Sequence, residues 1–184
     1  QDMLSYIDAL PDDLEKAWKL GQEFELPAFN NLKKVCIAGM GGSAIGGDFL
    51  AAYLSDECRL PILSWRNYGL PSWADGEECL VICSSHSGNT EETLSAFEMA
   101  KERGCQILAF CTGGELERRA KDAGVPAWIF EHHGQPRTAI PFSFGILLAL
   151  FVRLGFADFD LAELEEAVVL MRSKRASLTA TAPL

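Results

Sequence analysis

The sequence predicts an α/β fold, a three-layer α-β-α sandwich around a five-stranded parallel sheet with helices on both faces. Short apolar runs rich in β-branched residues alternate with longer amphipathic stretches, which is the pattern of parallel strands joined by crossover helices. The length of 184 residues is typical of one domain. Hydrophobic residues make up 48% and charged residues 23%, which is typical of a globular protein.

Five apolar runs are expected to be the strands of this sheet. They are Val35–Ala38, Ile62–Trp65, Cys79–Cys83, Gln106–Phe110 and Ala127–Phe130. Amphipathic stretches between them predict helices, each preceded by Gly, Ser or Thr in a position suited to capping. These helices are Ala44–Leu54, Thr90–Arg103 and Glu115–Asp122.

Helical segments are expected on both sides of this core, which divides the chain into three parts: 1–32, 33–156 and 157–184. The first part is amphipathic from Leu4 to Gly21 and is expected to be interrupted at Pro11. Ile140–Leu154 is strongly apolar, which indicates either a core helix or a subunit contact in a homodimer. Leu161–Leu178 is a charged amphipathic helix, and Thr179–Ala182 resembles an interdomain linker.

Charge and cysteine content exclude several classes of function. A formal net charge of −10 disfavours nucleic acid and anionic membranes as partners, although backbone N–H groups can still bind a small anion. The six cysteines lack the paired spacing of a zinc site, so we expect free thiols and no metal. The longest apolar run, Ala139–Leu150, is shorter than the roughly 20 residues that span a bilayer. The cytoplasm is the expected location.

A glycine-rich turn, Gly39–Gly47, directly follows the first strand and opens a helix. Glycines let a ligand approach the backbone, and the helix N-terminus offers unpaired N–H groups to an anion. Dinucleotides also use such turns. The second strand, however, ends in Trp65 and Arg66 without the acidic residue that binds a ribose, and no Walker A lysine follows the turn. We therefore expect no nucleotide cofactor.

A second polar loop follows the third strand and carries the hydroxyl side chains of Ser85, Ser87 and Thr90. Hydroxyls and helix N–H groups can converge there on one phosphate monoester. The alternative is that Ser87 and Thr90 only cap the helix. With flavodoxin-like strand order, strands one and three flank the switch point where ligands bind open parallel sheets. Both loops would then meet at one crevice.

These motifs resemble those of the bifunctional phosphoglucose/phosphomannose isomerases, in their N-terminal sugar isomerase (SIS) domain. The resemblance rests on the G-M-G-G-S run at Gly39–Ser43, the S-x-S-G-N-T-E-E-T run at Ser85–Thr93, and Pro136 and Arg137 before an apolar helix. It covers the chain from the first strand to Leu154. One difference is that His86 stands where the relatives usually have Tyr.

The resemblance implies roles for residues of both loops and a specific reaction. Substrate-binding residues would be Gly41, Gly42, Ser43, Ser85, Ser87 and Thr90. Arg137 would be catalytic and stabilise an anionic enediolate as glucose 6-phosphate or mannose 6-phosphate and fructose 6-phosphate interconvert. The catalytic glutamate, ring-opening histidine and a lysine of the family lie in a second SIS domain beyond residue 184. The isolated chain is therefore expected to bind a phosphorylated hexose with little or no turnover.

Some alternatives stay open from the sequence. Arg137 in a surface loop could simply be solvated, and His132 and His133 could be polar loop residues or could reach a ligand. A non-catalytic sugar-phosphate sensor is the second hypothesis for function, and a nucleotide-binding oxidoreductase is a distant third. The epimer preference between glucose and mannose cannot be deduced from this part of the sequence.

Overall fold

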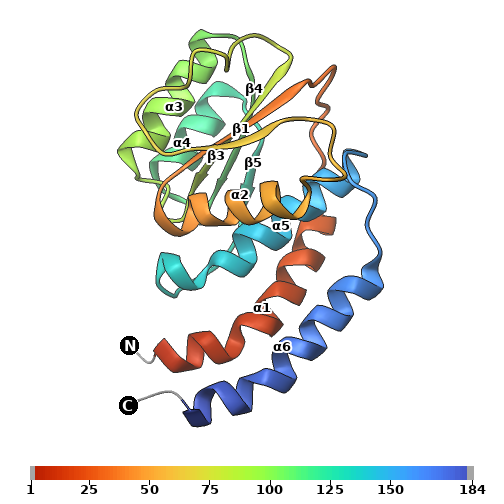
Figure 1. Ribbon diagram of the computed structural model, residues 1–184. Helices are drawn as coiled ribbons and strands as arrows, with labels where there is room; N and C mark the ends of the chain where they lie inside the picture. The colour runs from red at the N-terminus through yellow and green to blue at the C-terminus, as the bar shows by residue number, and fades with distance from the viewer. Residues whose placement is uncertain (1–2, 182–184) are drawn as a thin grey trace.

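The computed structural model describes residues 3–181 and has the predicted three-layer architecture, with a parallel sheet between two layers of helices (Figure 1). The strands follow the order β2-β1-β3-β4-β5, and every pair is parallel. Their bounds are β1 Lys34–Gly39, β2 Ile62–Trp65, β3 Cys79–Ser85, β4 Gln106–Cys111 and β5 Ala127–Ile129. The order reverses between β1 and β3, which confirms the flavodoxin-like order and its switch point.

Alternate residues of the strands pack against different helix layers, as strand geometry requires. Val35 and Ile37 of β1 face a core shared with α1 (Met3–Glu23), α2 (Gly41–Tyr53) and α5 (Ile140–Arg153). Cys36 and Ala38 face the opposite core, which α3 (Glu91–Glu102) and α4 (Gly114–Ala123) cover. The sheet is therefore buried on both faces, which explains why its central strands are apolar throughout.

The N-terminal helix differs from the sequence-based expectation, because Pro11 lies inside a continuous α1. A proline inside a helix removes one backbone hydrogen bond and costs about 3 kcal/mol. Packing against α5 compensates for this loss: Leu14, Ala17 and Gly21 of α1 are buried, and the Arg153 guanidinium of α5 donates to the carbonyl oxygen of Gly21 at 2.7 Å. Tertiary contacts therefore outweigh the local preference.

The two C-terminal helices have different environments. Most of α5 is buried between α1 and α2, so the core interpretation of Ile140–Leu154 holds for most of this helix. By contrast, α6 (Leu161–Thr181) lies against α1 on the side away from the sheet (Figure 1). Thr179, Ala180 and Thr181 are helical and continue α6, while Ala182 lies outside the described residues, as do residues 1–2 and 183–184 of the predicted flanking segments. That this segment leads to another domain stays a prediction.

Two further properties of the described chain bear on function. All six cysteines are free thiols, and Cys36, Cys79, Cys83 and Cys111 are buried. Within residues 3–181, no helix combines the length and apolar character needed to cross a membrane.

Candidate functional site

The glycine-rich turn forms the junction between β1 and α2. Met40 occupies the N-cap position of α2, and no side chain caps this end of the helix. Gly41 has φ +52°, and a Cβ added there would meet no atom within 4 Å. The backbone at Gly41 therefore borders open space, and the first N–H groups of α2 have no partner from a capping side chain.

The short helix η1 (Pro136–Thr138) packs tightly against this turn. A Cβ on Gly42 would lie 2.4 Å from the carbonyl oxygen of Pro136 and 3.3 Å from the backbone nitrogen of Arg137. No side chain fits in that space, so Gly42 is what allows the loop after β5 to reach the glycine-rich turn. This contact brings the backbone of Arg137 to the first loop.

The serine- and threonine-rich loop forms the junction between β3 and α3. The hydroxyls of Ser85 and Thr90 lie 2.9 Å apart and share a hydrogen bond. Thr90 is the N-cap residue of α3, but its side chain makes no capping bond. The hydroxyl oxygen of Ser87 accepts the backbone N–H of Asn89 at 3.2 Å. Helix capping alone therefore does not explain Thr90, and the N-terminus of α3 has hydroxyls beside its unpaired N–H groups.

A direct hydrogen bond joins the two junctions. The backbone N–H of His86 donates to the Ser43 hydroxyl at 3.0 Å, and the Ser84 hydroxyl donates to the Ser43 carbonyl oxygen at 3.4 Å. Ser43 is only 6% exposed, so its hydroxyl fixes the two loops relative to each other and points into the protein. The structure therefore brings together Gly41, Gly42, Ser43, Ser85 and Thr90 at one edge of the sheet.

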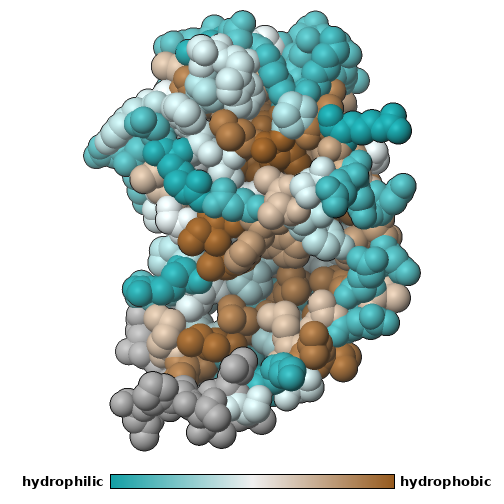
Figure 2. All heavy atoms as spheres, viewed as in Figure 1, coloured by the Kyte–Doolittle hydropathy of each residue, from teal (hydrophilic) through white to brown (hydrophobic). Residues whose placement is uncertain are grey.

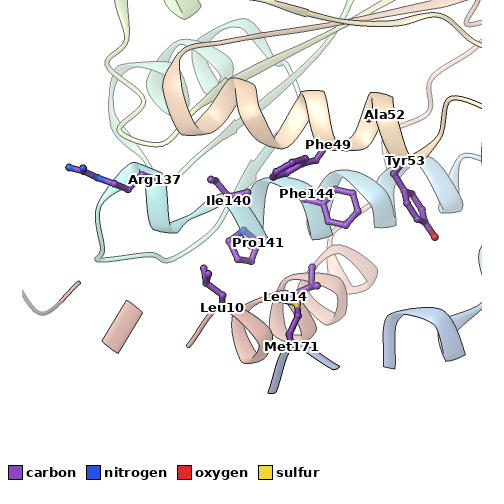
Figure 3. Close-up of a pocket in the computed structure, with 10 residues that line it drawn as sticks. All are labelled: Leu10, Leu14, Phe49, Ala52, Tyr53, Arg137, Ile140, Pro141, Phe144 and Met171. Atoms are coloured by element: carbon purple, nitrogen blue, oxygen red, sulfur yellow. The ribbon is translucent and has the colours of Figure 1, made fainter. Parts of the chain in front are cut away.

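Among the described residues, the side chain of Arg137 makes no hydrogen bond with these hydroxyls. Figure 3 shows its guanidinium pointing away from the apolar side chains around it. Arg137 is exposed, and within residues 3–181 we find no ion pair for its guanidinium. The backbone contact at Gly42 thus brings the residue to the site, while its charged group faces solvent.

His86 and His132, whose roles the sequence left open, form a pair near the two junctions. His86 Nε2 lies 2.9 Å from His132 Nδ1, and the ring centroids are 5.1 Å apart. Burial lowers the pKa of His86, and the neighbouring His132 lowers it further. Burial likewise lowers the pKa of His132, and the positive potential of His133 and Lys16 lowers it further. Single histidines in a sequence give no signal of such pairing.

A separate feature is an apolar groove of about 650 Å³ between α1, α2, α5 and α6. Figure 3 shows side chains such as Leu10, Phe49, Pro141 and Phe144 around it, and Figure 2 shows hydrophobic residues exposed over the helical half of the same face. This groove contains none of the predicted substrate-binding residues, and only Arg137 at its edge connects it with them.

The sequence is similar to those of known isomerases. A bifunctional phosphoglucose/phosphomannose isomerase of Caldicellulosiruptor bescii is 40% identical to this chain over 174 residues, which are 94% of the chain and 51% of that protein. The chain belongs to the family of these isomerases. A second member, from Aquifex aeolicus, is 39% identical over 136 residues, or 73% of this chain and 40% of that protein. The chain thus spans about half the length of these relatives or less.

A solved structure shares the fold. A putative phosphosugar isomerase from Clostridium difficile superposes with a TM-score of 0.67 over 95% of this chain and 52% of that chain, at 16% identity. At this identity the likeness supports the fold alone. No model of a protein family matches the chain.

Proposed function

We propose that this chain is the phosphosugar-binding half of an aldose–ketose isomerase that interconverts glucose 6-phosphate or mannose 6-phosphate with fructose 6-phosphate. The observation that carries the proposal is the Ser43–His86 hydrogen bond, which fixes two helix N-termini without side-chain caps at the switch point of the sheet. Helix N-termini attract anions, and the kinship with phosphoglucose/phosphomannose isomerases supports a sugar phosphate as that anion.

The phosphate group would bind at the start of α3. Ser85, Ser87 and Thr90 would donate hydroxyl hydrogen bonds, and the first N–H groups of the helix would face the phosphate oxygens. The sugar would extend toward Gly41 and Gly42, where the backbone is open to a ligand. Holding the phosphate end would position the reacting carbons, because remote binding energy reduces the entropy lost on the way to the transition state.

The chemical step would pass through an enediolate after ring opening. Removing a proton next to the carbonyl creates negative charge on oxygen, which a nearby cation stabilises. We assign this role to Arg137, supported by the contact between its backbone and Gly42 and by the exposure of its side chain, which leaves room for reorientation toward a substrate. A catalytic base and a ring-opening acid would come from residues outside this chain, so the isolated chain would show little or no turnover.

The binding proposal is tested by calorimetry with fructose 6-phosphate, fructose and NAD. We expect fructose 6-phosphate alone to bind. Thr90→Val should weaken its binding about tenfold, because one hydrogen bond to a charged group contributes roughly 1.5 kcal/mol or more. Ser173→Ala is the matched control: it removes a hydroxyl that bonds only the Leu170 carbonyl oxygen of exposed α6, and binding should not change.

The enzymatic part needs a separate measurement. Turnover of fructose 6-phosphate by the full-length protein, abolished by Arg137→Ala, supports the isomerase. Binding without turnover in the full-length protein would instead favour the sugar-phosphate sensor. Substantial turnover by residues 1–184 alone would contradict the assignment of the base and acid to residues outside this chain.

We also propose a homodimer that works in the cytoplasm. The free thiols support a reducing compartment, where sugar phosphates are also metabolised. The apolar groove supports a self-contact, because Phe49 and Tyr53 beside it are 53% and 44% exposed in the single chain. Light scattering should give a dimer mass for the wild type and a monomer mass for Phe49→Glu; a wild-type monomer at micromolar concentration would rule out this dimer.

A further inference from the structure

The His86–His132 pair connects two loops that the proposed function assigns to different ends of the substrate. His86 belongs to the phosphate-binding loop after β3, and His132 belongs to the loop after β5 that leads to Arg137. Their ring nitrogens are at hydrogen-bond distance, 2.9 Å, and the rings are nearly perpendicular at 83°. The pair is thus a side-chain link between these two loops, whereas the backbone contact at Gly42 joins the loop after β5 to the glycine-rich turn.

The surroundings leave His86 little freedom to move. Its N–H donates to the Ser43 hydroxyl at 3.0 Å. Its carbonyl oxygen accepts both the N–H of Thr112 at 3.1 Å and the Thr112 hydroxyl at 2.6 Å. These bonds to Ser43 and Thr112 hold the main chain of His86 in place. Its ring extends to His132 in the loop after β5.

His132 is held on the opposite side of the contact. Its ring lies 5.5 Å from the Phe142 ring of α5 and 6.3 Å from the Tyr6 ring of α1. Its second nitrogen, Nε2, is buried and has no hydrogen-bond partner among the described residues. A hydrogen on Nε2 would thus be an unpaired buried donor, which proteins rarely contain. The favoured tautomer places the hydrogen on Nδ1, so that His132 donates to His86 Nε2.

The charges around the pair favour its neutral form. From α1, Lys16 and Tyr6 face His132, and His133 follows it in the same loop, while α5 presents the apolar Phe142. Besides burial, His132 lowers the pKa of His86, and His133 and Lys16 lower the pKa of His132. Both pKa values are lowered, so at pH 7 the two rings share one hydrogen bond without a net charge.

We propose that His86 and His132 are positioning residues, whose mutual hydrogen bond sets the separation between the phosphate-binding loop and the loop that carries Arg137. This rests on the proposed function. A bound hexose 6-phosphate would span both loops, so a fixed separation would bind it without the entropy cost of ordering them.

The geometry of the two amide side chains provides a sharp test. The amide of Asn occupies the place of a histidine Nδ1, and that of Gln the place of Nε2. His132→Asn and His86→Gln should therefore retain the link, whereas His132→Gln and His86→Asn should lose it. Calorimetry with fructose 6-phosphate should show affinity within about twofold of the wild type for the first two variants, and about 5- to 10-fold weaker binding for the other two, as expected for one hydrogen bond. His133→Asn, at an exposed neighbouring histidine, is the control and should bind as the wild type.

Two readouts separate this role from a merely structural one and from failure of the proposed function. Amide hydrogen exchange should rise together in residues 85–90 and 131–138 of His132→Gln; a rise in one loop alone overturns the proposal. Nitrogen NMR of the wild type at pH 7 with no ligand present should show hydrogen on His132 Nδ1 and none on His86 Nε2; hydrogen on both of these facing nitrogens, or on neither, would overturn the assigned link. If the wild type binds no sugar phosphate, the proposed function fails, while these two readouts still decide whether the link exists. If His132→Gln has a lower melting temperature but an unchanged affinity for fructose 6-phosphate, the proposed positioning role is also overturned.

Discussion

The two strand-to-helix junctions of the site occupy equivalent places in the fold but differ in chemistry. The β1–α2 junction offers bare backbone: Gly41 borders open space, and its one hydroxyl, on Ser43, points inward. The β3–α3 junction has Ser85, Ser87 and Thr90 around its helix end. The first junction is suited to fit the shape of a ligand, and the second is suited to bind a charged group. Neighbouring strand-to-helix junctions of one sheet can thus be suited to different chemical groups of the same ligand.

The largest loss of stability should come from adding a side chain at Gly42, where the β1–α2 junction packs most closely against η1. Gly42→Ala places a Cβ 2.4 Å from the Pro136 carbonyl oxygen, and because both partners are backbone, η1 or α2 must shift. Overpacking of this kind costs about 1–3 kcal/mol, which lowers the melting temperature of a domain of this size by about 2–10 °C. Differential scanning calorimetry measures this, with Ile45→Ala on the exposed side of α2 as control. An unchanged melting temperature would show that the two segments do not pack as described.

A smaller effect is expected from the bond between the junctions. Ser43→Ala removes the acceptor for the His86 N–H, and leaving a part-buried donor without a partner costs about 1–2 kcal/mol. The melting temperature should fall by about 3–6 °C. Ser87→Ala, which removes an exposed hydroxyl of the second junction, should leave it nearly unchanged. Equal shifts in the two variants would mean that Ser43 does not link the loops.

The smallest effect should come from acidification, and only the second junction should respond, because Gly41–Gly47 contains no titratable side chain. The folded-state pKa values of His86 and His132 lie below the usual 6.5, so on acidification the unfolded chain takes up protons before the folded one does. Their contribution to stability is complete above pH 6.5 and is lost as the pH falls toward the folded values.

Melting temperatures between pH 7.5 and 5.5 test this point. The wild type should lose stability over this range, and His132→Asn should lose less of it. Carboxylates with lowered pKa, such as Glu98 and Glu115, act at lower pH, since their usual pKa is 4.5. An identical pH profile for the two proteins would show that the pair does not titrate in this range.

The fold was predictable from sequence because its determinants are local. Alternation of strand and helix patterns identified all five strands, and β2 has the predicted bounds. Pro11 was misjudged, since a helix-breaking residue is a local signal that packing overrides, and Thr179–Thr181 prove to be helical. For the site, the two loops were recognisable as motifs, but the His86–His132 contact was not. It depends on the distance between residues 46 positions apart, which the tertiary structure sets.

The attachment of α6 has a consequence for how the molecule comes apart. Among the side chains of α6 that the structure describes, Leu164 and Val168 are buried; they pack against Leu14, with aromatic neighbours such as Trp18 and Phe159. The ion pairs of Arg172 with Asp12 and Glu15 are exposed and contribute little. Detachment of α6 therefore exposes far less apolar surface than opening the sheet, and it should form its own low-energy unfolding unit. The edge that carries the two strand-to-helix junctions belongs to the other, more cooperative unit and would keep its shape while this helix is released.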